Sequence, residues 1–304
     1  MSYVTALGRR NTIIIAIAVS CVAICIGLST WVFEGGTFAH ALTDFVGTVG
    51  TAVLVSLAVL WAIRSRLARH EHRPSNDVMG FVYATIGVIY GVILGFVVIT
   101  VWQEFEDATA RTDQEALTVA NLIRLTPGLP ESSRAEAQQT LMDYLDIVVT
   151  NEWPQMEADQ PLGDEGIQKI NTLWDIYAQA QAEHTDSAYF SEGLDQLTNL
   201  GTLRRERVLT ANESLPAILW IVLVAGGALT VAFAGGFSVE SWGLHAWMVA
   251  ALAGLIAILL LLVVELNQPF RGDIRVDDNS FRFVMDQFSG GSSDATGGYI
   301  IESK

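Results

Sequence analysis

The sequence predicts an all-helical membrane protein with about five transmembrane spans and a helical bundle inserted between the third and fourth spans. Composition is the first indication: 51% of the 304 residues are hydrophobic and 16% are charged, whereas soluble domains average about 25% charged residues. The second is that charge is segregated. Residues 103–214 contain 21 of the 33 acidic residues and only 7 of the 17 basic ones. The chain therefore combines an apolar membrane part with an acidic, water-exposed part.

This charge balance also excludes several classes of protein. A nucleic-acid binder needs a clustered basic face for the phosphate backbone, and the formal net charge here is −16. The only cysteines are Cys21 and Cys25, which excludes a disulfide scaffold and a cysteine zinc site. We expect no nucleic-acid partner, no metal and no cofactor.

Five apolar stretches are long enough to cross a bilayer, since about 20 helical residues span its hydrocarbon core. The first of these stretches follows two arginines, as the apolar part of a secretion signal does. The sequence after it, Glu34-Gly35-Gly36-Thr37, is not a small-residue cleavage site, so we interpret the stretch as a membrane anchor. We therefore expect a multi-pass protein of the cell membrane, in contact with lipid. The five stretches are Thr12–Phe33, Phe45–Ile63, Phe81–Trp102, Ala217–Phe237 and Leu244–Leu266.

The acidic region has helical periodicity throughout. Apolar residues spaced three and four apart extend the third span out of the membrane as far as Pro127. Ser133 and Glu136 have capping-box spacing and predict the start of a second helix, whose apolar face continues to Pro154. Two further helices are centred on residues 167–177 and 194–203. Four such helices predict a bundle with its acidic residues on solvated faces.

These elements predict five regions along the chain. They are an anchor span with a short loop at 1–44, the second and third transmembrane helices at 45–102, the acidic bundle at 103–214, the fourth and fifth transmembrane helices at 215–266, and a C-terminal tail at 267–304 that is disordered from about 289.

The arginines give two opposing indications of orientation. Arg9 and Arg10, with the four arginines of residues 64–73, place those stretches in the cytoplasm and the acidic bundle outside. The arginines of residues 204–207 and 271–282 favour the opposite orientation. Under either one, the bundle and the tail lie on the same side, because two spans separate them.

Small residues form a stripe along the third span. Such a stripe allows close packing against another helix, and it also fits a span that lines a pore, with two tyrosine hydroxyls facing a passing ion. Both interpretations stay open at this point. The candidate residues are Tyr83, Gly87, Tyr90, Gly91 and Gly95.

Three acidic residues, Glu104, Glu106 and Asp107, follow this span. Repeated by symmetry, they would form a charged ring at a pore mouth, of the kind that sets valence selectivity. An equally open interpretation is that they only make the end of the span soluble. No span carries an ionisable residue near its middle, which disfavours proton-coupled transport. No paired carboxylates or nucleophile–base arrangement indicates an enzyme.

Several motifs together resemble the bestrophin-like family of bacterial integral membrane proteins. They are Tyr90-Gly91 through Phe96, Trp102-Gln103-Glu104-Phe105-Glu106, Glu115-Ala116, Leu215-Pro216 with Trp220, and Glu265-Leu266-Asn267-Gln268-Pro269-Phe270-Arg271-Gly272. The positions that we carry over as family motifs are Glu115, Pro216, Trp220, Pro269, Phe270 and Gly272.

The resemblance implies a four-span core and a homo-oligomeric ion channel around a central axis, with a pentamer as one option. It places the third span along the pore and the middle domain in the cytoplasm. Bestrophin pore necks carry bulky apolar side chains four residues apart, a spacing that Phe81, Tyr83, Tyr90 and Phe96 do not keep. Bestrophins also favour anions, whereas the acidic bundle favours cations, and that conflict stays open.

We therefore predict a bestrophin-like homo-oligomeric channel that passes small inorganic ions passively through a pore lined by the third span. The alternative is a non-conducting membrane scaffold whose acidic domain binds a protein partner. In that case the Gly/Ser-rich tail after residue 289 would act as a flexible tether.

Overall fold

The computed structural model describes residues 38–67, 76–182, 188–237 and 239–289. All regular structure in these residues is helical, which confirms the all-helical part of the predicted fold for this part of the chain. The predicted span Thr12–Phe33 and the tail beyond residue 289 lie outside the described residues. The chain divides into two compact units: Met1–Glu104 with Ser214–Gln268 and Gly272–Ile274, and Phe105–Glu213 with Pro269–Arg271 and Arg275–Lys304.

The first unit contains helices α2 (Phe38–Leu67), α8 (Ala217–Gly235) and α9 (Trp242–Leu266) together with the first part of α3 (Asn76–Leu125). Among the described residues, α3, α8 and α9 are long and apolar enough to cross a membrane. In α2 the apolar stretch is shorter, Gly47–Trp61. The predicted spans two to five thus all fall on observed helices.

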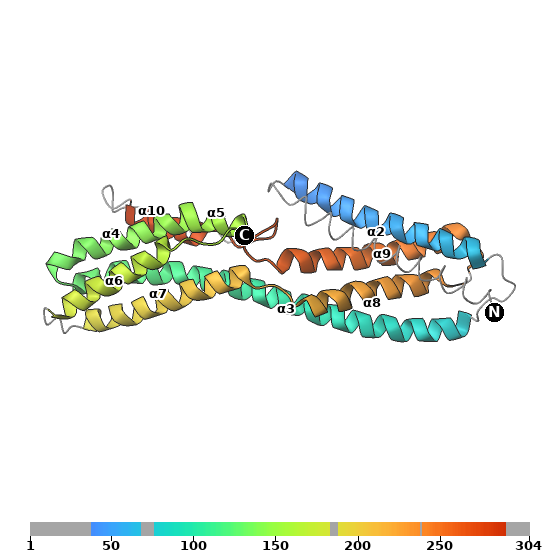
Figure 1. Ribbon diagram of the computed structural model, residues 1–304, viewed down its shortest axis with the longest axis horizontal. Coiled ribbons are helices and arrows are strands. Elements are labelled where there is room, and N and C mark those ends of the chain that lie inside the picture. The colour runs from blue at the N-terminus through green and yellow to red at the C-terminus, as the bar shows by residue number, and fades with distance from the viewer. Residues whose placement is uncertain (1–37, 68–75, 183–187, 238, 290–304) are drawn as a thin grey trace, which may run out of the picture. The chain divides into compact units, whose positions relative to one another are not determined.

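Small residues let the helices of this unit approach one another closely. Helix α2 runs along α9 (Figure 1), and a Cβ added at Gly254 of α9 would lie 3.6 Å from Val53 of α2. A Cβ at Gly227 of α8 would lie 3.1 Å from Ile256 of α9. Because lipid removes the hydrophobic drive between helices, such close contacts supply much of the packing energy.

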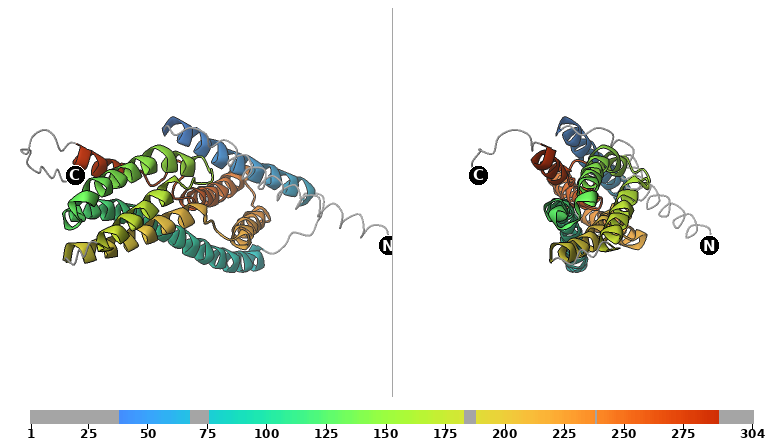
Figure 2. Two further views of the ribbon diagram at one scale, coloured as in Figure 1. Left: turned by 60° about the vertical axis from the view of Figure 1, so that its left-hand side comes forward. Right: turned by 90° about the vertical axis from the view of Figure 1, so that its left-hand side faces the viewer.

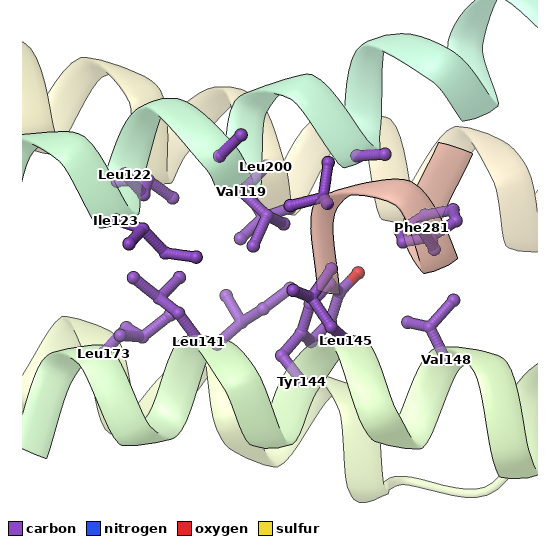
Figure 3. Close-up of a cluster of buried hydrophobic side chains, with 14 of the residues drawn as sticks. Val119, Leu122, Ile123, Leu141, Tyr144, Leu145, Val148, Leu173, Leu200 and Phe281 are labelled. Atoms are coloured by element: carbon purple, nitrogen blue, oxygen red, sulfur yellow. The ribbon is translucent and has the colours of Figure 1, made fainter. Parts of the chain in front are cut away.

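The second unit contains the C-terminal part of α3 and helices α4 (Glu131–Ile147), α5 (Trp153–Glu157), α6 (Glu165–Ala182), α7 (Ala188–Asn212) and α10 (Asn279–Ser289). Helix α4 packs against both α6 and α10, and α6 packs against α7 (Figure 2). Its core is apolar. Side chains from α3, α4, α6, α7 and α10 point toward one another there (Figure 3), among them Leu122, Leu141, Leu173, Leu200 and Phe281.

The predicted end of the long helix is confirmed. Helix α3 ends at Leu125, and a short 3-10 turn, η1 (Thr126–Gly128), contains Pro127. Proline cannot continue the α-helical hydrogen bonding. A Cβ at Gly128 would lie 2.5 Å from Cβ of Tyr189, so only glycine allows this close approach of α7.

Two local predictions about α4 are wrong. The helix begins at Glu131 after Pro130, without a side-chain cap, so Ser133 lies inside the first turn, where it is buried, and is not the cap. Pro154 does not end the helical path either. A π-helical segment, η2 (Val148–Glu152), leads directly into α5, where Pro154 occupies the first turn. The amide of that position lacks an intrahelical partner in any helix, so proline is tolerated there.

The C-terminal segment contributes to the core of the second unit, which the sequence analysis did not anticipate. Phe270, Val276, Phe281 and Val284 are all buried in it. Helix α10 presents Phe281 and Val284 to the core and polar residues to solvent. The bundle therefore depends on residues that follow α9 in the chain.

Candidate functional site

One face of α3 within the first unit is buried and the opposite face is exposed. Tyr90, Leu94, Val97 and Val101 are buried. The opposite face carries large apolar side chains that no other helix among the described residues covers. They are Phe81, Val88, Val92, Phe96 and Ile99, which are 53–78% exposed.

The glycines of α3 border this exposed face. A Cβ added at Gly87, Gly91 or Gly95 would meet no atom within 4 Å among the described residues. Among the helices that the structure describes, none packs closely against these glycines.

The two tyrosines of the sequence-predicted site contact residues of the same protomer. The ring of Tyr90 packs on α8, where a Cβ at Gly226 would lie 2.5 Å from it. Its hydroxyl is buried and has no hydrogen-bond partner in the described part of the chain. Tyr83 is half-buried and stacks edge-on against Phe237, with 5.6 Å between ring centroids. Both side chains lie away from the exposed apolar face.

All three acidic residues at the end of the span are exposed on α3. Glu106 follows Val88 by eighteen residues, which is five turns at about 3.6 residues per turn, so both lie on the same side of the helix. At about 100° per residue, Glu104 lies about 160° around the helix from Glu106, and Asp107 about 100°, so neither of them continues this line. Glu106 is therefore the acidic residue that continues the exposed apolar face.

A cluster of buried charged groups occupies the core of the second unit. The side chain of Arg207, on α7, is 0% exposed. Its Nε donates to Oε2 of Glu115 at 2.8 Å, and its Nη2 donates to Oε2 of Glu152 at 2.7 Å. Arg204, one turn earlier, donates from Nη2 to Oε1 of Glu152 at 2.6 Å. The Tyr144 hydroxyl donates to Oε1 of Glu115 at 2.5 Å. Two arginines thus neutralise two glutamates.

Each member of this cluster comes from a different segment or turn. Glu115 lies on α3, Tyr144 on α4, Glu152 at the end of the π-helical segment, and the arginines on α7. A Cβ at Gly166, in the first turn of α6, would collide with the Glu152 carboxylate, so a glycine is needed there. The π-helical segment has about one more residue per turn than an α-helix, and such insertions often mark functional positions. Here the segment ends at Glu152 and places its carboxylate beside the two arginines.

The environment of the cluster keeps its charges in place. Burial alone would raise the pKa of Glu152, but Arg207 and Arg204 outweigh burial and hold that pKa below its ordinary value. Burial opposes the charge of Arg207, yet Glu115, Tyr144 and Glu152 hold its pKa well above the ordinary value. Burial, followed by the Glu115 charge, raises the pKa of Tyr144 well above its ordinary value. Glu152 and Arg207 therefore stay ionised at neutral pH.

Aromatic rings complete the surroundings of Arg207. Its guanidinium lies 5.7 Å from the ring centroid of Trp153 and 5.8 Å from that of Phe281. The polar groups are satisfied by one another and the rings exclude water. This arrangement locks the bundle together and leaves no room for a ligand.

Sequence reasoning found one member of this cluster, Glu115, as a family-motif position. It missed the arginines, although a signal exists: Arg204 and Arg207 continue the face of α7 that carries the buried Leu197 and Leu200 at spacings of three and four. A basic residue in line with core leucines, in an acidic domain, indicates a buried ion pair.

The remaining family-motif positions shape the connections around α8 and α9. Pro216 precedes the first residue of α8, and Trp220 lies in its first turns, half-buried. Gly272 has φ of +78°, which favours glycine, and the next amide, of Asp273, donates to the Glu265 carboxylate at 3.2 Å.

In the second unit, the carbonyl of Pro269 accepts from the Val276 amide at 2.7 Å. Phe270 packs edge-on against Trp153, with 5.6 Å between centroids. These contacts fix the connection that leads from α9 to α10. Within the described ranges, no group of three or more His, Cys, Asp or Glu residues could hold a metal ion.

The sequence matches the Bestrophin-like domain over residues 50–281. The chain belongs to this Bestrophin-like family. Among curated proteins, none matches the chain. Solved structures support the family fold: a variant of the bacterial bestrophin homologue from Klebsiella pneumoniae has a TM-score of 0.64 at 11% identity, covering 80% of this chain and 99% of that one.

A second structure of the Klebsiella pneumoniae homologue, phased on zinc, has a TM-score of 0.62 at 12% identity and covers 80% of this chain and 96% of that one. A variant described as a membrane protein has a TM-score of 0.62 at 12% identity, covering 79% and 96%. At these identities the likeness concerns the fold.

Proposed function

We propose that this Bestrophin-like protein is a homo-oligomeric channel of the cell membrane that passes small inorganic ions passively along α3. The observation that carries the proposal is the uncovered apolar face of α3. Val88, Val92 and Phe96 follow one another at intervals of four on this face, which is the spacing of bulky apolar side chains in bestrophin necks. These three residues, rather than Tyr83 and Tyr90, form the constriction.

The glycines give the helix copies room to meet. Gly87, Gly91 and Gly95 lie beside the constriction residues, and a Cβ added at any of them would meet nothing within 4 Å in the described ranges of the chain. Small residues at such spacing let helix backbones approach closely in a membrane. In the assembled channel they lie at the contact between neighbouring subunits.

Glu106 supplies the charge at the end of the pathway. Around a symmetry axis its copies form a ring, and a ring of carboxylates favours cations. Glu104 and Asp107 are exposed on other sides of α3 and add less to its field. The acidic bundle that follows, with its 21 acidic residues between positions 103 and 214, raises the local cation concentration in the same direction.

Purified protein reconstituted in a planar bilayer tests this function. We expect a conductance whose reversal potential shifts in a KCl gradient, and Phe96→Ala should raise the current by opening the constriction. Ile218→Ala is the matched control, because Ile218 is equally apolar and 63% exposed, but lies on α8. Currents no larger than those of empty bilayers would exclude the channel.

A further inference from the structure

The outer side of α7 carries an open groove. Its volume is about 530 Å³, and Trp174 of α6 and Leu209 form exposed apolar walls. Gly201 leaves its centre free, because a Cβ there would meet nothing within 4 Å. Arg205 lines the groove and makes no ion pair in the part of the chain that the structure describes. We call this feature the α7 groove; its other lining residues are Leu197, Thr198, Thr202 and Glu206.

A complementary feature lies on α10. Its outward face is polar except for Phe283, which is 68% exposed. Asp286 follows one turn later on the same face, and its carboxylate forms no ion pair within the described residues. A lone aromatic residue in a polar face, beside an exposed carboxylate that also interacts electrostatically with Arg282, is the composition of an interface anchor.

Contacts with α3 place these two features on opposite flanks of that helix. On one flank, Arg111 of α3 pairs with Glu206 of α7 at 3.5 Å. On the other flank, Asp113 accepts a hydrogen bond from Ser280 of α10 at 2.5 Å, and Arg124 lies 5.5 Å from the ring centroid of Phe288. Between the flanks α3 exposes Leu117. The two flanks differ. Subunits whose α3 helices surround a common axis therefore meet head to tail, with α7 of one subunit against α10 of the next.

We propose that Phe283 of each subunit inserts into the α7 groove of the next subunit, with Asp286 facing Arg205. This inference rests on the proposed function, which arranges the α3 helices around an axis. The groove is filled by a second copy of this chain because the two features complement each other. One flank carries the apolar Phe283 with the negative Asp286, and the other carries the apolar groove with the positive Arg205. Repetition of that contact closes a ring without leaving an unmatched surface.

The size of the two features is consistent with this contact. A phenylalanine side chain that is enclosed buries about 150–250 Å² of its surface. The α7 groove has a volume of about 530 Å³, which is large enough to hold one aromatic ring. The open position at Gly201 is the natural place for the ring, because any side chain there would fill the groove. The anchor and its groove would be the strongest single contact between neighbouring acidic bundles.

Disulfide trapping tests the contact in the full-length protein. In a Cys21→Ser, Cys25→Ser background, the pair Gly201→Cys and Phe283→Cys should give a ladder of covalent multimers in native membranes under mild oxidation, and each single variant should not. The pair Thr172→Cys and Phe283→Cys is the matched control, because Thr172 of α6 is half-buried, as Gly201 is, but does not line the groove. Oligomeric particles that give no ladder would overturn the inference and leave the channel standing.

Charge reversal gives a second, independent measurement. The oligomer in detergent is diluted, and the protein concentration at which it dissociates is measured. Arg205→Glu should raise this concentration by about tenfold, and adding Asp286→Arg should restore the original value. Equal dissociation of all three proteins would overturn the Arg205–Asp286 contact. If the unmodified protein is monomeric at every concentration, the proposed channel and this inference both fall.

Discussion

At the scale of single residues, Arg207 has the largest expected effect on stability. Its removal leaves Glu115 and Glu152 as buried charges without their main partner, and breaking such a pair costs about 3–5 kcal/mol. We expect Arg207→Met to lower the free energy of unfolding by this amount, measured by thermal and denaturant unfolding of the purified protein. Lys169→Met is the matched control, since Lys169 pairs with Asp143 at the surface of the same unit, and it should change stability by less than about 1 kcal/mol. Equal effects of the two substitutions would contradict the buried cluster.

The same cluster predicts a pH dependence. Because the folded-state pKa of Glu152 is lowered, its stabilisation is fully present above the ordinary carboxyl pKa of about 4.3 and is lost as the pH falls through the lower folded value. We expect a constant melting temperature from pH 8 to about 5 and a decline below about 4. Glu152→Gln should lower the melting temperature at neutral pH but make the acid decline shallower. An unchanged acid slope in this variant would assign the pH dependence to other carboxylates.

Among the three acidic residues at the end of the span, we expect Glu106 to have the largest effect on ion selectivity. Glu106 lies in line with Val88 on the exposed side of α3, whereas Glu104 and Asp107 lie off that line. Glu106→Gln should therefore shift the reversal potential in a KCl gradient toward lower cation preference more than Glu104→Gln or Asp107→Asn does. Equal shifts for all three would indicate that only the total charge of the pore mouth matters.

At the scale of elements, the two sets of glycines in the membrane helices have different roles. Gly226 on α8 faces the ring of Tyr90, and an added Cβ would lie 2.5 Å from it. Gly226→Ala therefore forces α3 and α8 apart and should cost about 1–3 kcal/mol of protomer stability by overpacking. The methyl group of Gly91→Ala would meet no atom within 4 Å in the part of the chain that the structure describes, so its effect should appear in the dissociation of the oligomer. Thermal unfolding and particle mass, measured on both variants, distinguish these effects; loss of protomer stability in Gly91→Ala would contradict the assignment.

The elements also explain what the sequence could predict. Helix type and the end of α3 before Pro127 depend on local periodicity and on a proline, and both were predicted. Which face of α3 is buried could not be, because nearly every residue from Phe81 to Trp102 is apolar and the pattern has no polar side to orient it. The pairing of Arg207 was also inaccessible, because Glu115 and Glu152 lie 92 and 55 residues away in the chain. Long-range partners of this kind follow from tertiary structure, which local patterns do not determine.

At the scale of the whole molecule, the acidic bundle is completed by residues that follow α9 in the chain. Trp153 packs against Phe270 and Phe281, and Phe281 also contacts Arg207 through its ring face. A fragment that contains residues 103–214 alone would expose this apolar surface and leave one side of the Arg207 environment open to water. Burial of two phenylalanine side chains is worth about 3–6 kcal/mol in total, a large share of the stability of a small domain.

We therefore expect the 103–214 fragment to bind a dye that reports exposed apolar surface and to unfold without a sharp transition. The same fragment joined by a Gly/Ser linker to residues 269–289 should unfold cooperatively and at higher temperature, as followed by circular dichroism. The matched control carries Phe281→Ser in the joined fragment, which keeps the length but removes the buried ring, and it should return the behaviour of the shorter fragment. Cooperative unfolding of residues 103–214 alone, at the same temperature as the joined fragment, would show that α10 only covers a bundle that is already complete.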